Sequence, residues 1–280
     1  VLPSEMPSTF DAEALKAQAV CARTFVYSQM KNTQYALYGA NIDNTTAFQV
    51  YNASETKQST DEAVKATAGQ VVSCGGSLIT CYYFSTSAGK TEDMEVWSSS
   101  TPDFIHKVES VDDNSPYYRW TSELDLSAYN DPQYGTATGI SVDKTSDAGY
   151  VLSLTINYGN KSQTFTAEND IRKALGHYQK KVTLNDGSVR ENMSMIPSAC
   201  FSVSAGANGH YTLSGGGFGH GAPGVAVDAQ RGHVGLDVNG FHRAVLDGGH
   251  RIGGNGHGRG GDVAILRTLR TGGDGDFHSG

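Results

Sequence analysis

The chain has 280 residues, a formal net charge of -8 and 38% hydrophobic residues. This length is enough for one large domain or two small ones with a substantial core. The acidic balance argues against a nucleic-acid partner, because such a partner needs clustered Lys and Arg to neutralise phosphates. No apolar run reaches the roughly 18 residues of a membrane span, and the first residues lack the pattern of a signal peptide. We expect a globular protein that is truncated at its N-terminus.

The first element that the sequence predicts is a helix from Asp11 to about Gln29, in "DAEALKAQAVCARTFVYSQ". Ser8, Thr9 and Asp11 compete as its N-cap. Most positions of this stretch are apolar, which is typical of a helix in the centre of a domain.

Two basic residues of this helix, Lys16 and Arg23, are seven positions apart and lie on one face, about 10.5 Å apart along the axis. Lys16 could pair with Glu13 or extend to water, and Arg23 could satisfy a buried carbonyl or carboxylate. Spacing alone favours the structural role for Lys16 and leaves Arg23 undecided.

Glu5 lies before this helix, between two prolines. One interpretation is a solvated acid in a segment that Pro7 holds extended. The other is a general acid, which needs a raised pKa. A helix N-terminus would lower the pKa of the carboxyl, whereas burial would raise it, and the sequence leaves this balance open.

Two elements follow close together in the sequence. "STDEAVKATAG" predicts a helix over 59–69, with Ser59 and Glu62 at the spacing of a capping box and Gly69 as its end. "QVVSCGGSLITCYYF" predicts two strands joined by a hairpin turn at Gly75-Gly76.

The second half of the chain adds a strand and a helix. "YVLSLTINYG", from Tyr150, alternates like a strand, and "TAENDIRKALG" predicts a short helix capped near Thr166 and ended by Gly176. Strands and helices without regular βαβ alternation favour the α+β class. We therefore expect a single domain over 1–220, in which a central buried helix packs on antiparallel strands.

The four cysteines are at positions 21, 74, 81 and 200. The hairpin register places Cys74 opposite Ser77 and Cys81 opposite Gln70, so these two sulfurs are too far apart for a bridge, whose Cα atoms must come within about 7 Å. The sequence favours free, buried thiols, and it contains no spacing typical of metal ligands.

The composition changes sharply after His220. Residues 221–280 contain 17 of the 34 Gly and five of the nine His, with no Lys, Glu, Tyr, Trp, Met or Cys. A Gly-rich, disordered tail is one interpretation, because such a segment cannot bury enough apolar surface to fold. A His-based metal-binding tract and a misread reading frame are the others.

The stretch "VLPSEMPSTFDAEALKAQAVCARTF" resembles the N-terminal motif of the stage II sporulation protein D family of peptidoglycan lytic transglycosylases. Further similarity follows in family order, in "DEAVKATAGQVV", "YYFSTSAGKTEDMEVW", "PDFIHKVESVDD", "IRKALG", "IPSACFSV" and "GGGFGHG". Together these segments span most of residues 1–220, so the resemblance covers the whole expected domain.

The resemblance implies cleavage of the β-1,4 bond between N-acetylmuramic acid and N-acetylglucosamine, with formation of a 1,6-anhydro sugar. One carboxyl suffices for this chemistry, because the attacking hydroxyl belongs to the substrate. Glu5 matches the family's catalytic Glu, which acts first as acid and then as base.

Eight further positions are candidate substrate contacts, seven of them because they match positions of the family motifs and Tyr118 because it is an aromatic residue that can contact a glycan. They are Lys16, Arg23, Ser85, Thr86, Ser87, Thr91, Tyr118 and His220. Other interpretations remain for the last six: a tight, hydroxyl-rich turn for the Ser and Thr residues, core packing for Tyr118 and an unmatched surface position for His220.

Two departures from the family pattern matter. Phe84 stands where some members have a His, and Ala88 replaces a Gly, so the ligands of the family's zinc site have no match and we expect no metal and no cofactor. After "GFGHG" the family continues G-M-S-Q-x-G-A, whereas this chain enters its Gly-rich tail. We attribute the change to a frameshift or assembly error after about Gly221.

The partners implied by the resemblance are peptidoglycan glycan strands and a cell-wall amidase. The leading alternative function is a non-catalytic, glycan-binding amidase enhancer, and an inactive fragment is a third. The substrate lies outside the cytoplasm, so we expect an extracytoplasmic protein whose signal or membrane anchor precedes Val1.

Overall fold

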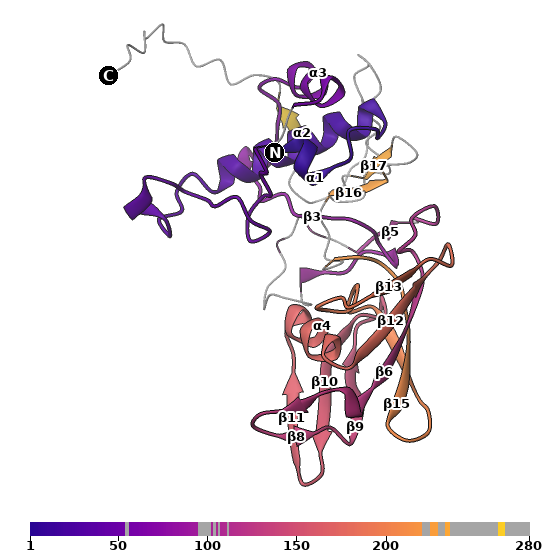
Figure 1. Ribbon diagram of the computed structural model, residues 1–280. Coiled ribbons are helices and arrows are strands. Elements are labelled where there is room, and N and C mark those ends of the chain that lie inside the picture. Colours follow the sequence, from indigo (N-terminus) through magenta and orange to yellow (C-terminus); the bar gives the residue numbers. More distant parts are fainter. Residues whose placement is uncertain are drawn as a thin grey trace, which may run out of the picture. The chain divides into compact units, whose positions relative to one another are not determined.

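The computed structural model describes residues 1–53, 56–94, 102, 105, 107–110 and 112–219, together with the backbone of 225–228, 233–235 and 263–266. These residues form a mixed structure of helices and strands, which confirms the α+β class (Figure 1). They divide into two compact units after Cys81. This division falls within residues 1–220, which the sequence predicts to be a single domain.

Unit 1 contains residues 1–81 and is built around one long helix. Its elements are α1 (Leu2–Glu5), α2 (Ala12–Ser28), the 3-10 turn η1 (Ala36–Tyr38), α3 (Gln58–Ala66), β1 (Val71–Cys74) and β2 (Ser77–Leu78). The strand β18 (Val263–Leu266) pairs antiparallel with β1 and belongs to the same unit.

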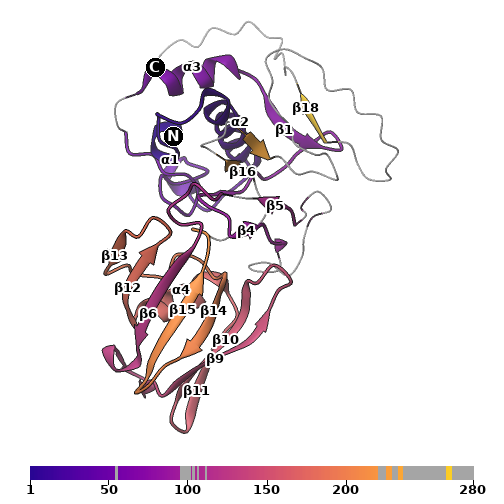
Figure 2. The same ribbon diagram turned by 90° about the vertical axis from the view of Figure 1, so that its right-hand side faces the viewer.

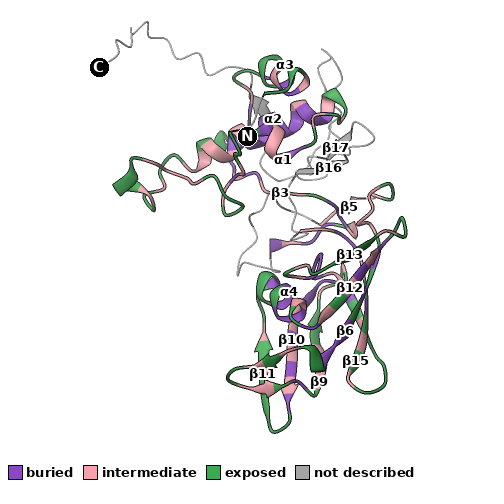
Figure 3. Cartoon of the chain, viewed as in Figure 1, coloured by how far each residue is buried: buried purple, intermediate pink, exposed green. Residues whose placement is uncertain are grey.

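Helix α2 begins where the sequence predicts, because Asp11 caps it by accepting the N–H of Glu13 at 2.9 Å. Nine of its side chains are buried. Figure 3 shows buried residues along most of the helix, within unit 1. One of them, Thr24, accepts the N–H of Val72 in β1 at 3.0 Å and so ties the helix to the sheet.

The hairpin after α3 has the predicted turn and register. Gly75 and Gly76 both have positive φ, 56° and 78°, which a two-residue type I′ turn requires and glycine permits. Cys74 pairs with Ser77 as expected, but β2 ends at Leu78, so pairing stops before Cys81.

The predicted caps of the two shorter helices are wrong. Helix α3 starts at Gln58 without a side-chain cap, because the Ser59 hydroxyl donates instead to the carbonyl of Ser8, 2.7 Å away. Helix α4 (Glu168–Gly176) has Ala167 at its N-cap, again without a side-chain cap. Helix α4 ends at Gly176, as predicted. Glycine is needed there because the chain packs closely: a Cβ on Gly176 would lie 2.5 Å from the Ser194 carbonyl oxygen.

Unit 2 begins at Tyr82 and is mainly antiparallel sheet. Its larger sheet has the order β13-β12-β6-β15-β14, seen side by side in Figure 2. These strands are β6 (Trp120–Asp125), β12 (Gln179–Leu184), β13 (Val189–Glu191), β14 (Phe201–Ala205) and β15 (His210–Gly215). A second sheet, β11-β10-β9, consists of β9 (Gly139–Thr145), β10 (Val151–Tyr158) and β11 (Lys161–Phe165).

Short strands and a 3-10 turn complete unit 2. They are β3 (Tyr83–Phe84), β4 (Gly89–Lys90), β5 (Glu109–Ser110), η3 (Leu126–Ala128), β7 (Asn130–Asp131), β8 (Gly135–Thr136), β16 (Val225–Asp228) and β17 (His233–Gly235). The last two lie in the Gly-rich tail, as does β18. The rest of the tail after Gly219 lies outside the described residues, so its expected disorder stays a prediction.

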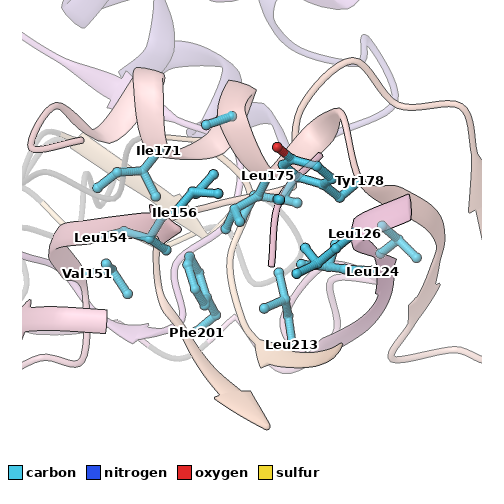
Figure 4. Packing of buried hydrophobic residues seen from close by; sticks show 14 of the residues in the cluster. Leu124, Leu126, Val151, Leu154, Ile156, Ile171, Leu175, Tyr178, Phe201 and Leu213 are labelled. Atoms are coloured by element: carbon cyan, nitrogen blue, oxygen red, sulfur yellow. The ribbon is translucent and has the colours of Figure 1, made fainter. Parts of the chain in front are cut away.

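The core of unit 2 lies where α4 packs against the sheets. Leu154 and Ile156 of β10 meet Ile171 and Leu175 of α4, each at most 1% exposed (Figure 4). Strand β10 therefore alternates as the sequence predicts. No helix among the described residues combines the length and the apolar character that crossing a lipid bilayer requires.

Candidate functional site

Glu5 is the last residue of α1, a single helical turn that sequence patterns do not predict. Pro3 lies in this first turn, where a missing N–H is no loss. The next residue, Met6, is extended with φ -141° and ends the turn. Glu5 therefore ends a short helix of its own, and α2 starts only at Ala12.

The Glu5 carboxylate accepts a hydrogen bond from the backbone N–H of Val50, 45 positions away in the sequence. The same segment makes two further contacts with the helices of unit 1. The Asn52 N–H donates to the Ser4 hydroxyl at 3.2 Å, and the buried Gln49 amide donates to the Ala22 carbonyl of α2 at 3.1 Å. Residues 49–52 thus bond to both α1 and α2 and fix the Glu5 carboxyl through the N–H of Val50.

Burial is the largest influence on the pKa of Glu5 and raises it. The hydrogen bond from Val50 lowers the pKa, but by less, so the pKa is above its ordinary value. The sequence leaves open whether burial or nearby N–H groups dominate the pKa of Glu5, and in the structure burial dominates. A carboxyl of this kind holds its proton to higher pH, which is the property that a general acid needs.

The two most deeply buried of the other described carboxyls, Glu92 and Glu168, are held in ion pairs. Glu92 is 0% exposed, and although burial raises its pKa, hydrogen bonds from Lys107 and other groups bring the pKa below its ordinary value. Burial raises the pKa of Glu168, but the Arg172 guanidinium lies 3.1 Å from its oxygen. Both pairs lie in unit 2 and stabilise their own segments.

The basic residues of α2 have partners within unit 1. The Lys16 ammonium lies 2.5 Å from a Glu13 oxygen, and each side chain is about a third exposed. The Arg23 guanidinium donates to the carbonyls of Thr67 at 2.8 Å and Gln70 at 2.9 Å, just past the end of α3. These are the structural roles that spacing allows, and the substrate contacts implied by the resemblance stay predictions.

The Ser and Thr residues predicted to contact substrate lie in unit 2 and form a tightly bonded turn. Thr86 and Thr91 are at most 3% exposed. The Thr86 hydroxyl lies 2.7 Å from that of Ser115, and Thr91 accepts the N–H of Val108 at 2.9 Å. The Ser87 hydroxyl, also buried, donates to the carbonyl of Ser110 in β5.

Of the four predicted Ser and Thr contacts, only Ser85 is exposed, so its hydroxyl is the most accessible to a ligand. Tyr118, also in unit 2, is partly buried and lies against Arg119, whose guanidinium carbon is 4.0 Å from the ring centroid. His220 lies outside the described residues. Among the described residues, no three His, Cys, Asp or Glu side chains gather into a group that could hold a metal ion.

The structure thus places Glu5, Lys16 and Arg23 in unit 1, and Ser85 and Tyr118, with the rest of the Ser and Thr loop, in unit 2. Sequence reasoning missed the residues that hold Glu5. The group that Val50 donates is its backbone N–H, which nearly every residue type has, so the side chain at position 50 does not reveal this contact.

Comparisons with known proteins agree with the N-terminal motif. Residues 1–73 match the family model described as stage II sporulation protein. The amidase enhancer of Bacillus subtilis is 45% identical over 125 residues, which are 44% of this chain and 16% of that protein.

Two relatives match over a longer stretch. The stage II sporulation protein D of Bacillus subtilis is 32% identical over 63% of this chain and 55% of its own length. An uncharacterised protein of Brachyspira hyodysenteriae is 30% identical over 79% of this chain and 56% of its own length. The chain therefore spans only about half the length of these two relatives, and its match to the stage II sporulation protein family model lies in residues 1–73.

Proposed function

We propose that the protein is a peptidoglycan lytic transglycosylase. It cleaves the bond between N-acetylmuramic acid and N-acetylglucosamine in glycan strands and leaves a 1,6-anhydro sugar, in cell-wall remodelling such as that of sporulation. The observation that carries this proposal is the half-buried Glu5 carboxyl, whose pKa is raised, within the segment that matches the family. The name of the stage II sporulation protein D relative supports the biological setting.

In the proposed reaction, Glu5 starts protonated and donates its proton to the oxygen of the leaving N-acetylglucosamine as the glycosidic bond breaks. The resulting carboxylate then takes a proton from the 6-hydroxyl of the muramoyl unit, whose oxygen closes onto the anomeric carbon. Glu5 is again protonated at the end, so the reaction needs no second carboxylate and consumes no water. Lys16, Arg23 and Ser85 are proposed to contact the sugars.

Substitution Glu5→Gln tests the proposal. Glutamine retains the shape of the side chain but cannot transfer the proton, so we expect the rate of anhydro-sugar formation to fall by about 10²–10⁴-fold. The measurement is mass spectrometry of products from purified glycan strands stripped of peptides.

Glu62→Gln is the matched control, because Glu62 is an exposed carboxylate on α3 in the same unit. We expect this variant to cut at the rate of the unaltered protein. If the Glu5→Gln protein folds normally and still forms anhydro ends at that rate, Glu5 is not the catalytic acid.

A second function, stimulation of a cell-wall amidase without cleavage, is favoured by the relative named amidase enhancer, which is 45% identical. The two functions give different results with Glu5→Gln. An enhancer would form no anhydro ends and would stimulate the amidase equally well with either residue at position 5. Both functions require an extracytoplasmic location, which we also propose.

A further inference from the structure

A cavity of about 690 Å³ lies in unit 2, at the end of the larger sheet where β6 and β14 begin and β12 and β15 end. This volume is within the range of roughly 300–1,000 Å³ that small-molecule sites occupy. The described residues that line the cavity all belong to unit 2, whereas Glu5 lies in unit 1. We propose that this cavity binds a sugar that carries a carboxylate, such as N-acetylmuramic acid with a free lactyl group.

A row of four hydroxyl side chains crosses the sheet at this cavity. Thr121 of β6 pairs with Thr183 of β12 on one side and with Ser214 of β15 on the other. Ser214 pairs in turn with Ser202 of β14. Directly opposite residues of neighbouring strands point to the same face, so the row runs across the four strands that Figure 2 shows side by side. All four residues line the cavity.

These hydroxyl groups are available to a ligand. Thr121, Ser202 and Ser214 are exposed, and Thr183 is partly buried. The Ser202 hydroxyl donates to the Ser214 carbonyl at 3.4 Å. The hydroxyls of Thr121, Thr183 and Ser214 have no hydrogen-bond partner within the described part of the chain. A hydroxyl both donates and accepts, so such a row suits the hydroxyl and N-acetyl groups of a sugar.

Arg119, directly before β6, supplies the charge at the cavity. Its Nη1 donates to the carbonyls of Ala88 at 3.0 Å and Tyr118 at 2.7 Å, and its guanidinium carbon lies 4.0 Å from the Tyr118 ring centroid. These contacts fix the guanidinium plane, while Nε and Nη2 have no partner among the described residues. That free edge offers two parallel N–H donors, which is the geometry that a carboxylate accepts in a bidentate pair.

Charge complementarity favours an acidic sugar over a neutral one. Of the described residues that line the cavity, Arg119 alone carries a charge. The next row on the same face contains Lys181 and Glu123, whose ion pair of 3.0 Å adds no net charge. An unpaired cation in a chain with a net charge of -8 favours an anionic ligand at this one place.

The glycan that Glu5 is proposed to cut contains such a sugar, and the inference rests on the proposed function for that identification alone. N-acetylmuramic acid carries a lactyl carboxylate, which is free wherever the strand lacks a peptide. The inference goes beyond cleavage, because it gives unit 2 a binding role of its own.

An NMR titration of the isotope-labelled full chain with matched probes tests the carboxylate. N-acetylmuramic acid should bind about 10-fold more tightly than its methyl ester, which retains the size but loses the charge, and than N-acetylglucosamine, which lacks the lactyl group. The shifts should gather at Thr121 and Thr183. D-lactate should bind at least about 10-fold more weakly than the sugar, because it lacks the groups that bind the hydroxyl row. Equal affinity for the acid and its ester would overturn the proposal, as would D-lactate binding as tightly as the sugar.

Two pairs of variants locate the site. Arg119→Gln should weaken binding of N-acetylmuramic acid about 10-fold, and Arg190→Gln, exposed on β13 outside the cavity, should not. Thr121→Val removes one hydroxyl from an exposed strand position and should weaken binding about 3-fold. Its control is Thr212→Val, on the same sheet but outside the cavity. Thr121→Val leaves the carbonyl contacts of Arg119 intact, so it stays decisive if Arg119→Gln disturbs the fold. Unchanged binding in both Arg119→Gln and Thr121→Val would overturn the proposal.

Binding and cleavage are measured separately, so their failures are distinguishable. A protein that binds the acid over its ester but forms no anhydro ends would contradict the proposed function and leave this inference standing. A protein that cuts glycan strands but binds acid and ester equally would contradict this inference alone.

Discussion

At the scale of single residues, the pKa of Glu5 decides what its carboxyl can do. Its raised pKa means that the folded protein binds this proton more tightly than the unfolded chain does. Stability from this group is therefore full below the ordinary pKa and is lost as the pH rises through the raised one. The same shift extends the protonated, acid-competent form to higher pH.

We predict that the rate of anhydro-sugar formation declines on the alkaline side with an apparent pKa above 4.5, the ordinary value for this carboxyl. The physical reason is the burial of Glu5. A pH–rate profile on peptide-free glycan strands measures it, and a decline centred below 4.5 would contradict it.

A stability measurement checks the same shift without activity. Lowering the pH from 7 through 4.5 should raise the melting temperature of the unaltered protein relative to Glu5→Gln, since only the former takes up this proton. A difference that does not vary with pH would mean that burial leaves the Glu5 carboxyl unperturbed.

At the scale of elements, α2 organises unit 1 through its side chains. Its buried face packs on β1, and Arg23 supplies N–H donors to carbonyls beyond the last turn of α3. Helix ends leave carbonyls without intrahelical partners, so a guanidinium there stabilises the end.

We predict that Arg23→Ala lowers the free energy of unfolding by about 1–3 kcal/mol, because the carbonyls of Thr67 and Gln70 lose a charged donor. Lys16→Ala on the same helix is the control. Its ion pair with Glu13 is partly solvated and should cost about 0.5 kcal/mol or less. Urea unfolding measures both, and equal losses would show that Arg23 does not stabilise α3.

How far the sequence predicts these elements depends on the range of the interactions. Helix α2, strand β10 and the Gly75-Gly76 turn depend on local periodicity and turn chemistry, and all three are found. The cap of α3 fails because Ser59 binds Ser8, 51 positions away. The bond between Glu5 and Val50 and the order of the larger sheet likewise depend on tertiary contacts that no local pattern reports.

At the scale of the whole molecule, the described chain consists of two compact units, and each contains buried hydrophobic residues. Leu15 of α2 and Leu154 of β10 are each 0% exposed, one in each unit. Compact units often unfold separately, so we expect a cavity in one unit to leave the other unit folded.

We predict that Leu15→Ala and Leu154→Ala each lower the free energy of unfolding by about 2–5 kcal/mol. The loss should be confined to the unit that carries the substitution. Hydrogen exchange followed by mass spectrometry measures this unit by unit, and the two variants serve as controls for each other. Equal loss of protection in both units from either change would show that the chain unfolds as one cooperative body.

The hydrogen bond that Glu5 accepts comes from the main chain of Val50, and every amino acid except proline offers the same N–H at that position. The orientation of the carboxyl is therefore robust to side-chain substitution at residue 50. It depends instead on the path and length of the chain between α2 and α3. Insertions or deletions in residues 29–57 are then the mutations that would move the Val50 donor, and this stretch, far from residue 5 in sequence, is where the acidity of Glu5 can be tuned.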